Sequence, residues 1–296
     1  MKPLGEVVNV ASVPQRSPFR YPGGKTWLVP RVRQWLASLE TRPAEFIEPF
    51  AGGGIVSLTV AAEKLARHVT MIELDEQVAA VWRAIITDGD GVWLADRIAN
   101  FGLIHDSLGK VLSEKARTVR ERAFQTILKN RTYHGGILAP GSAPLKSGEN
   151  GKGIASRWYA DTLKKRILAI NDIRLRLKFV EGDGMEEVRK NAHRRDAVFF
   201  VDPPYTAGGK QAGRRLYTHS ELDHEELFKV ISEVTGDFLM TYDNTDDVRD
   251  LARRYGFDFE LVAMQNTHLA KMTELLIGRN LDWARSARKP PGAGGL

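Results

Sequence analysis

A glycine-rich turn between a predicted strand and a predicted helix most constrains the fold of this chain of 296 residues. Residues 45–49 (EFIEP) predict a short strand, residues 50–54 (FAGGG) the turn, and residues 55–65 a helix by their apolar spacing. A second strand at residues 68–74 and a second helix at residues 76–86 follow. This strand–helix order is typical of parallel strands joined by crossover helices.

The same α/β pattern returns in the last third of the chain. Predicted strands cover residues 178–181, 197–201 (AVFFV), 238–242, 257–264 and 274–278. The unbroken apolar run at 197–201 suits a central parallel strand, buried on both faces. A helix is predicted over residues 219–233, with Ser220 as its N-cap. We therefore expect one sheet built from both halves of the chain.

The middle of the chain, residues 87–177, has a different character. It is predicted to be mainly helical and basic: residues 113–131 hold six Lys or Arg against two Glu, and residues 157–178 hold seven against two Asp. Residues 133–153 are rich in Gly, Ser and Pro and have no periodicity. Taken alone, such charge runs more often mark a solvated helical surface than a binding surface.

These patterns predict a helical domain inserted into an α/β domain. The α/β domain comprises residues 1–86 and 178–282, and the insertion comprises residues 87–177. Residues 1–17 are predicted to be a loose leader and residues 283–296, rich in Pro and Gly, a disordered tail.

Composition excludes several classes of protein. The chain has no cysteine, which excludes disulfides, thiolate metal sites and a cysteine nucleophile. Its formal net charge of +6 modestly favours a polyanionic partner. The longest apolar run, residues 55–62, is far shorter than the ~20 residues of a membrane helix, and the N-terminus lacks a secretory pattern. We predict a soluble, cytoplasmic protein with no membrane contact.

The glycine turn and the next strand together predict a nucleotide-like cofactor. Glycines let the backbone approach a ligand closely, and a following helix start offers free N–H groups. Glu73 stands at the tip of the second strand, where an acid usually binds ribose hydroxyls. Asp75 is better placed to cap the following helix. The Gly-Lys segments at 22–26 and 148–153 lack the spacing of a phosphate-binding P-loop, which excludes an ATPase of that type.

The tetrapeptide Asp202-Pro203-Pro204-Tyr205 carries the chemistry. The two prolines fix the backbone, so the carboxylate of Asp202 and the carbonyl of Pro203 are held as rigid acceptors beside an aromatic ring. Two acceptors suit an exocyclic amino group on a planar base, because hydrogen bonds to both hydrogens make its delocalised lone pair available. Tyr205 would stack on a base that has left the duplex. Attack on a methyl sulfonium then needs mainly alignment and a preorganised field.

At this point the sequence resembles the D12 class, or Dam-like, DNA adenine-N6 methyltransferases over residues 18–280. The resemblance implies a Rossmann-like S-adenosylmethionine-dependent sheet with an inserted target-recognition domain. Asp202, Pro203, Pro204 and Tyr205 match the family's catalytic tetrapeptide, and the resemblance implies no metal. It implies that the cofactor is held by Tyr21, Gly23, Lys25, Glu48, Phe50, Gly52, Gly54, Glu73, Asp183 and Asp202.

The same resemblance makes the basic insertion a surface for double-stranded DNA. The implied DNA-binding residues are Arg131, Tyr133, Lys146, Lys152, Arg157, Tyr217 and His219. The loop at 137–154 lacks the aromatic-rich hairpin of Dam itself, so GATC specificity does not carry over. Arg131 could read a guanine, or it could contact a phosphate or form an ion pair.

Several alternatives stay open. An RNA adenine substrate is possible, and so is a catalytically inactive DNA-binding relative. DNA cytosine-N4 methylation uses the same amino-group chemistry but usually places Ser where this chain has Asp202. Cytosine-C5 methylation is excluded because it needs a thiolate. The sequence does not determine the recognition site, a restriction-modification, orphan or phage setting, or whether the chain is a monomer or a weak dimer.

Overall fold

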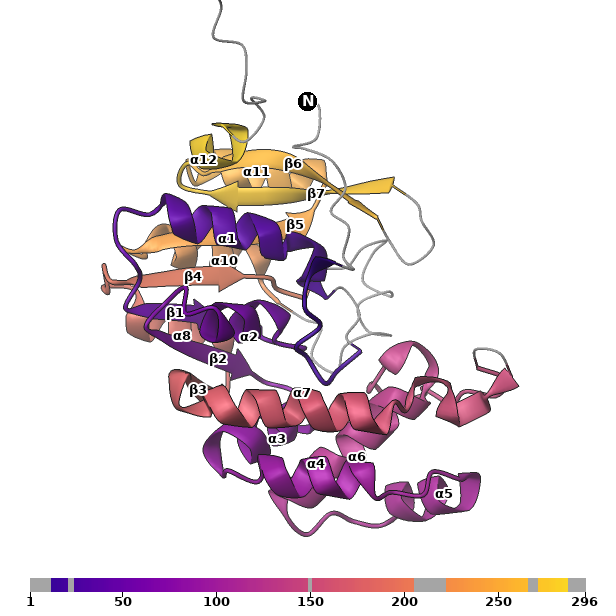
Figure 1. Ribbon diagram of the computed structural model, residues 1–296. Coiled ribbons are helices and arrows are strands. Elements are labelled where there is room, and N and C mark those ends of the chain that lie inside the picture. The colour runs from indigo at the N-terminus through magenta and orange to yellow at the C-terminus, as the bar shows by residue number, and fades with distance from the viewer. Residues whose placement is uncertain (1–11, 21–23, 149–150, 205–221, 266–270, 287–296) are drawn as a thin grey trace, which may run out of the picture.

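The structure is a computed structural model that describes residues 12–20, 24–148, 151–204, 222–265 and 271–286. Its centre is a seven-stranded mixed sheet of order β3-β2-β1-β4-β5-β7-β6 (Figure 1). The strands are β1 (Glu45–Glu48), β2 (His68–Glu73), β3 (Leu177–Glu181), β4 (Ala197–Val201), β5 (Asp237–Asp243), β6 (Asp258–Gln265) and β7 (Lys271–Gly278). The first five strands in chain order are parallel, and β7 is antiparallel to both β5 and β6.

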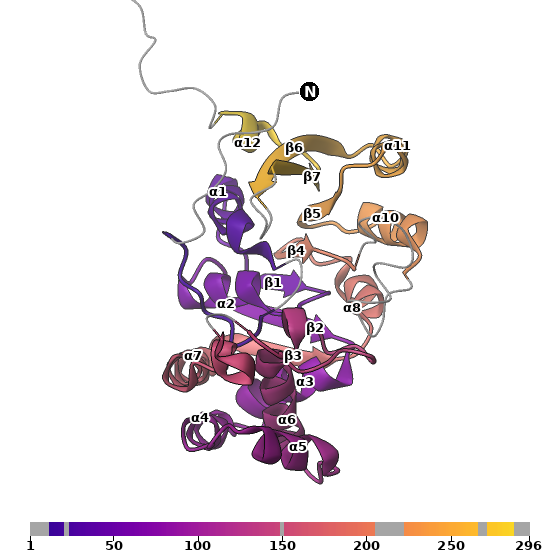
Figure 2. The ribbon, with the colours of Figure 1, turned by 90° about the vertical axis from the view of Figure 1, so that its right-hand side faces the viewer.

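Helices cover both faces of this sheet (Figure 2). One face carries α1 (Val29–Ser38), α2 (Ile55–Ala62) and α7 (Ala160–Ile173), and the other carries α8 (Gly184–Asn191), α10 (His224–Ser232) and α11 (Asp246–Arg254). The alternation of side chains along β4 explains the two layers: Val198 and Phe200 join the core of the first face, and Phe199 and Val201 that of the second. The expected α/β, Rossmann-like fold is confirmed.

The order of the strands determines where a ligand can bind. Strand order runs from β1 outward to β2 and β3 on one side, and from β4 to β5 on the other, so β1 and β4 meet where the direction reverses. In open α/β sheets, ligands bind at the carboxyl ends of the strands at this point. Glu48 ends β1, and Asp202 directly follows β4.

The middle of the chain folds as a helical lobe next to β3 (Figure 1). The lobe comprises α4 (Gly91–Ala99), α5 (His105–Ser113), α6 (Val119–Thr132) and α7, with 3-10 turns at His134–Gly136, Gly153–Arg157 and Arg174–Arg176. α3 (Glu76–Trp82), which continues as a π-helix over Arg83–Thr87, packs against α6. Leu94, Phe124 and Leu163 belong to the same core cluster as Leu58 of α2. The lobe is therefore continuous with one face of the sheet.

Two predictions about the ends of elements were wrong. The N-cap of α10 is Asp223, whose carboxylate accepts a hydrogen bond from the Glu226 N–H at 3.0 Å, and the helix begins at His224. The predicted cap Ser220 lies outside the described residues. In the predicted leader, Val13 is only 2% exposed and the Ser17 hydroxyl donates to the Gly53 carbonyl. Val13 and Ser17 are thus packed against the domain.

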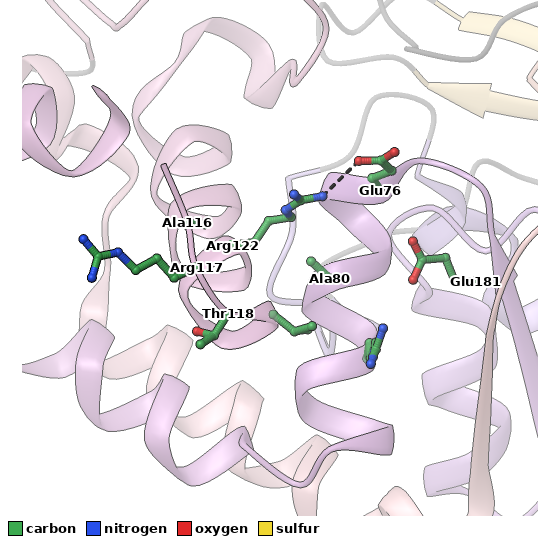
Figure 3. Close-up of a pocket in the computed structure, with 9 residues that line it drawn as sticks. Glu76, Ala80, Ala116, Arg117, Thr118, Arg122 and Glu181 are labelled. Atoms are coloured by element: carbon green, nitrogen blue, oxygen red, sulfur yellow. Dashed lines mark hydrogen bonds and ion pairs between the residues drawn. The ribbon is translucent and has the colours of Figure 1, made fainter. Parts of the chain in front are cut away.

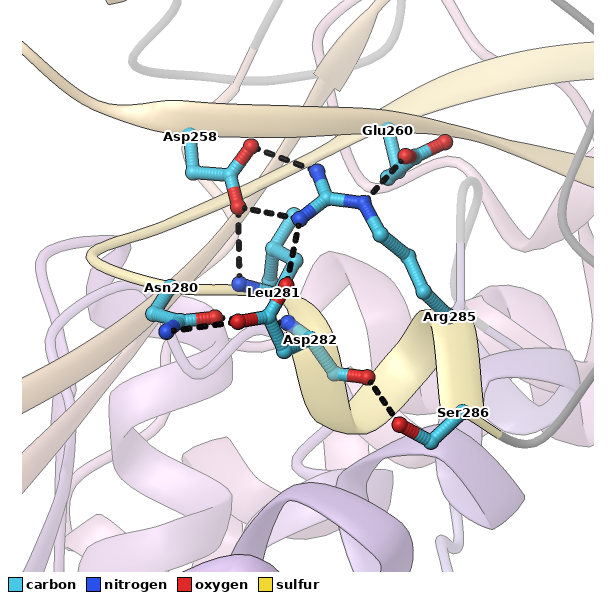
Figure 4. Close-up of polar contacts among 7 residues, drawn as sticks. All are labelled: Asp258, Glu260, Asn280, Leu281, Asp282, Arg285 and Ser286. Atoms are coloured by element: carbon cyan, nitrogen blue, oxygen red, sulfur yellow. Dashed lines mark hydrogen bonds and ion pairs between the residues drawn. The ribbon is translucent and has the colours of Figure 1, made fainter.

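The predicted tail also begins later than expected. Residues Asp282–Ser286 form α12, and Ala284 is fully buried. Arg285 donates to Asp258 at 2.6 Å and to Glu260 at 2.7 Å, and these carboxylates raise the pKa of Arg285 (Figure 4). The helix is therefore fastened to the edge strand β6. Among the described residues, every helix is too short or too polar to cross a membrane.

Candidate active site

The glycine turn is tied to its neighbours by backbone and side-chain hydrogen bonds. Ala51 N–H donates to the Ile72 carbonyl, and the Trp82 indole donates to the Gly52 carbonyl, both at 2.9 Å. Gly54 has a φ of +65°, and a Cβ there would lie 2.6 Å from the Met71 side chain. A side chain at position 54 would thus strain the backbone and collide with β2. The turn is held rigidly at the carboxyl end of β1.

Glu73 at the tip of β2 is bound to this turn. One carboxylate oxygen accepts from Gly52 N–H at 2.8 Å, and the other accepts from the N–H groups of Leu74 and Asp75, each at 2.9 Å. Burial raises the pKa of Glu73 to about 7, even though these N–H groups favour the charged form. Asp75 caps α3 by accepting from Gln77 and Val78, as predicted. The two acids therefore have different tasks.

Glu48 is the most deeply placed acid of the site. It is 4% exposed, and its carboxylate accepts from the Ser57 N–H of α2 at 3.0 Å. Burial raises the pKa of Glu48 to about 8, and the nearby charges of Asp202 and Glu73 add to the effect. Glu48 is thus mostly protonated at neutral pH, and its hydrogen bond links the end of β1 to the start of α2.

Asp202 is held by two donors on a single oxygen. The Lys25 ammonium lies 3.0 Å from Oδ1 of Asp202, and the Thr241 hydroxyl donates to the same oxygen at 2.8 Å. Within the described part of the chain, no donor bonds to Oδ2 of Asp202. Burial raises the pKa of Asp202, and Lys25 opposes that shift. The orientation of the carboxylate is therefore fixed through Oδ1.

Lys25 also bonds to Glu274 of β7, with 3.3 Å between Nζ and Oε2. Burial disfavours the charged ammonium, but the two carboxylates outweigh it and raise the pKa of Lys25. Sequence reasoning missed Glu274 and Thr241. Both are polar residues inside predicted apolar strands, which is the one signal that could have drawn attention to them.

Four carboxylates gather where the parallel strands end. They belong to Glu48, Glu73, Asp202 and Asp243, which end β1 and β2, follow β4 and end β5. Burial raises the pKa of Asp243, and the Asp202 charge adds to this shift. The ionised fraction of these acids makes the edge negative, which favours a cationic ligand.

The remaining predicted cofactor residues lie around this edge. Asp183 caps α8 by accepting from Met185 N–H at 2.7 Å. Gly184 lies so close to the turn that a Cβ there would be 2.0 Å from the Pro49 carbonyl oxygen. Phe50 packs against the core beneath the second face. Tyr21, Gly23, Tyr205, Tyr217 and His219 lie outside the described residues, so their placement stays a prediction.

The predicted DNA-binding residues that the structure describes lie on neighbouring segments, since Tyr133 bridges to Pro144 and the Gly153 N–H donates to the Ser147 carbonyl. Lys146 and Lys152 are exposed, whereas Tyr133 is half-buried and its ring lies 5.8 Å from Lys129 Nζ. Arg131 is only 4% exposed. The assignment of these five residues, including Arg157, to DNA stays a prediction.

A pocket of about 270 Å³ lies beside this edge, between α3, the start of α6 and the end of β3 (Figure 3). Arg122 reaches across it to Glu76, at 2.9 Å. None of the predicted site residues lines this pocket. Within the described ranges, no group of three His, Cys, Asp or Glu side chains could hold a metal ion.

The sheet, the glycine turn and the acids at the strand ends define a Rossmann-like cofactor-binding protein. Its residues 21–129 match the family model described as D12 class N6 adenine-specific DNA methyltransferase. The resemblance expected from the motifs is thereby confirmed over this stretch of the chain. No curated protein sequence matches the chain.

Several solved methyltransferase structures resemble the chain weakly. A candidate RNA methyltransferase from Pyrococcus horikoshii has a TM-score of 0.40 and 12% identity, with 91% of this chain and 92% of that chain covered. The rRNA methyltransferase AviRa from Streptomyces viridochromogenes has a TM-score of 0.39 and 13% identity, covering 91% and 90%. A precorrin-6y methyltransferase from Geobacter metallireducens has a TM-score of 0.36 and 13% identity, covering 88% and 91%. Similarity this low bears on neither substrate nor mechanism.

Proposed function

We propose that this chain transfers a methyl group from S-adenosylmethionine to the N6 amino group of adenine in double-stranded DNA. The observation that carries the proposal is the way in which Lys25 and Thr241 hold the Asp202 carboxylate. Its Oδ1 is occupied by Lys25 and Thr241, and its Oδ2 is left to accept an N–H of the target base. Pro203 follows directly and offers its carbonyl as the second acceptor.

The described residues suit the cofactor. Glu73 would accept from the ribose hydroxyls, because its carboxylate lies at the strand tip beside the turn. Asp183, at the next strand end, would accept from the adenine amino group. The carboxylates of the edge would attract a sulfonium, which is positively charged. When bound, the cofactor supplies an electrophilic methyl carbon.

The chain's own groups prepare the amine for this transfer. Asp202 Oδ2 and the Pro203 carbonyl each accept one hydrogen of the amino group, which moves its lone pair out of conjugation with the ring. The amino nitrogen so prepared would accept the methyl group that the cofactor supplies, and the electron pair of the broken carbon–sulfur bond would stay with sulfur. The alkylated nitrogen loses a proton to water, so no strong base is required. We expect Tyr205 to stack on the extruded base.

A methylation assay with nucleoside analysis tests the proposal. We expect the wild-type chain to yield N6-methyladenine from a duplex of mixed sequence, and Asp202→Ala to yield none while keeping its fold. Asp250→Ala is a matched control, since that aspartate of α11 is exposed and pairs with the exposed Arg253. Substantial turnover by Asp202→Ala would contradict the assignment of the acceptor.

The same assay separates the alternatives. N4-methylcytosine in the digest would show that the target base is cytosine and not adenine. Faster methylation of single-stranded or folded RNA than of duplex DNA would show that the substrate is RNA. A chain that binds no S-adenosylmethionine in calorimetry would be a DNA-binding relative without activity. Sequencing of modified positions in DNA from expressing cells would give the recognition site and show whether a restriction-modification role fits.

A further inference from the structure

Four arginines meet at the seam between the helical lobe and the N-terminal segment. Arg20 precedes the segment that leads to Lys25, Arg131 lies near the end of α6, Arg157 ends a 3-10 turn, and Arg166 lies on α7. Arg131 is 4% exposed, and the other three are half-buried around it. The proposed catalytic mechanism uses none of them.

Asn130 fixes this arrangement. Its side-chain oxygen accepts from the Arg20 N–H at 2.9 Å, and its Nδ2 donates to the Arg20 carbonyl at 2.9 Å and to the Gly136 carbonyl at 2.7 Å. Gly136 is required there, because a Cβ would lie 2.4 Å from the Arg20 carbonyl oxygen. The backbone of Arg20 is thus fastened beside Arg131, although the two residues are far apart in sequence.

Among the described residues, no carboxylate pairs with Arg20, Arg131 or Arg166, and the buried Nε of Arg131 has no hydrogen-bond partner. The Arg166 guanidinium donates to the Ser17 carbonyl at 3.0 Å. Burial lowers the pKa of Arg131 to about 9, and the charges of Arg166, Arg20 and Arg157 lower it further.

Such an arrangement is costly without an anion. A buried guanidinium lacking a partner loses its hydration, and like charges beside it repel. An arrangement that served only the fold would be better built with a carboxylate or an apolar side chain. Guanidinium groups are well suited to phosphate, because their planar N–H pairs match its oxygens.

We propose that Arg20, Arg131 and Arg166 form a binding site for a backbone phosphate of the DNA, with Arg157 beside it. The proposal rests on the proposed function and deepens it, because it assigns Arg131 to phosphate rather than to a base. One residue of the site, Arg20, belongs to the N-terminal segment that continues to Lys25, the partner of Asp202. A phosphate bound there positions the strand that carries the target adenine, without adding sequence preference.

The salt dependence of binding to a short duplex tests the site. We expect Arg20→Gln and Arg166→Gln to weaken binding about tenfold at low salt and to reduce the slope of log K against log salt by about 1 each. The matched control is Lys165→Gln, which removes an exposed charge from the same helix. It should leave the slope closer to that of the wild type. Slopes equal to the wild type in both arginine variants would overturn the proposal.

A second measurement does not depend on methylation. At constant ionic strength, inorganic phosphate should raise the melting temperature of the wild type more than chloride does, and Arg131→Gln should abolish this difference. The free Arg131→Gln protein should melt no lower than the wild type, since the change removes a repelled charge. If that variant does not fold, the half-buried Arg20→Gln and Arg166→Gln give the same test.

The outcomes also separate this proposal from the proposed function. If S-adenosylmethionine affinity falls in the arginine variants while the salt slope is unchanged, the site holds the cofactor carboxylate, and the proposal is wrong. If the wild type methylates no DNA yet keeps the phosphate effect that Arg131→Gln lacks, the proposed function fails and the anion site remains.

Discussion

Lys25 Nζ lies 3.0 Å from Oδ1 of Asp202, and this contact joins the N-terminal segment to the carboxyl end of the central strand β4. The lysine is 3% exposed, so the ion pair is sheltered on one side, while the aspartate side chain keeps 20% of its surface accessible. A charged partner on one oxygen favours the ionised carboxylate, against the burial that raises the pKa of Asp202, and in the proposed reaction the second oxygen faces the substrate. The pair therefore sets both the charge and the direction of the proposed acceptor.

Replacing Lys25 should remove the charge that keeps Asp202 ionised. We expect Lys25→Met to lower methylation at neutral pH on the order of a hundredfold, with part of the activity recovered as pH rises. The free energy of unfolding should fall by about 2 kcal/mol, since a partly accessible carboxylate loses its partner. A pH profile of kcat and chemical denaturation measure these effects. Lys164→Met, at an exposed pair with Asp96, is the control; equal losses in both variants would contradict the role.

Glu274 acts on Asp202 through Lys25. In Glu274→Gln the ammonium keeps a single carboxylate partner, so the pKa of Asp202 should fall and the acidic limb of the kcat profile should move to lower pH. The removed negative charge should also weaken the binding of the cationic cofactor a few-fold. Calorimetry and a pH profile give the two readouts. An unchanged acidic limb, despite a folded protein, would show that Glu274 serves packing only.

Glu73 should make cofactor affinity depend on pH. Burial raises the pKa of Glu73 to about 7, and ribose hydroxyls donate hydrogen bonds to the ionised form. Affinity for S-adenosylmethionine should therefore rise as pH increases through 7 and level off above 8. Titration calorimetry from pH 6 to 8.5 checks the trend. Glu73→Gln should bind S-adenosylmethionine more weakly than the wild type at pH 8.5, with an affinity that does not change with pH. A wild-type affinity that falls between pH 6 and 8.5 would contradict the role of Glu73.

Glu48 should make the protein less stable at alkaline pH. The pKa of Glu48 is raised to about 8 in the folded state, above its unfolded value of 4.5, so its neutral form is the one that folding favours. The contribution is fully present below pH 4.5 and is lost as pH rises through 8. Glu48→Gln keeps an acceptor for Ser57 N–H and should be more stable than the wild type at pH 8.5. Urea denaturation at pH 6 and 8.5 measures the difference, which should shrink at the lower pH.

Much of the sheet could be predicted from local pattern. The run at 197–201 and the strand that ends in Glu73 were found because apolar stretches bounded by turns are strong signals, and β4 and β2 match them closely. Helix α1 was not predicted, and β6 and β7 were not expected to be antiparallel. Strand direction depends on the connection between strands, and the short link from β6 to β7 permits a hairpin where a crossover is impossible.

The residues of the candidate site also fall into two groups, those that the sequence predicted and those that only the structure revealed. Glu73 was singled out at the tip of a predicted strand, Asp75 as the cap of the following helix, and Asp202 as the first residue of the Asp-Pro-Pro-Tyr tetrapeptide. The sequence by itself thus determined the turn, the strand ends and the class of chemistry, since these depend on neighbours within a few residues. Only the tertiary structure brought Glu274 to Lys25 and gathered the arginines around Arg131. Contacts between residues far apart in the chain depend on how the sheet and the lobe pack, and burial and pKa follow from that packing.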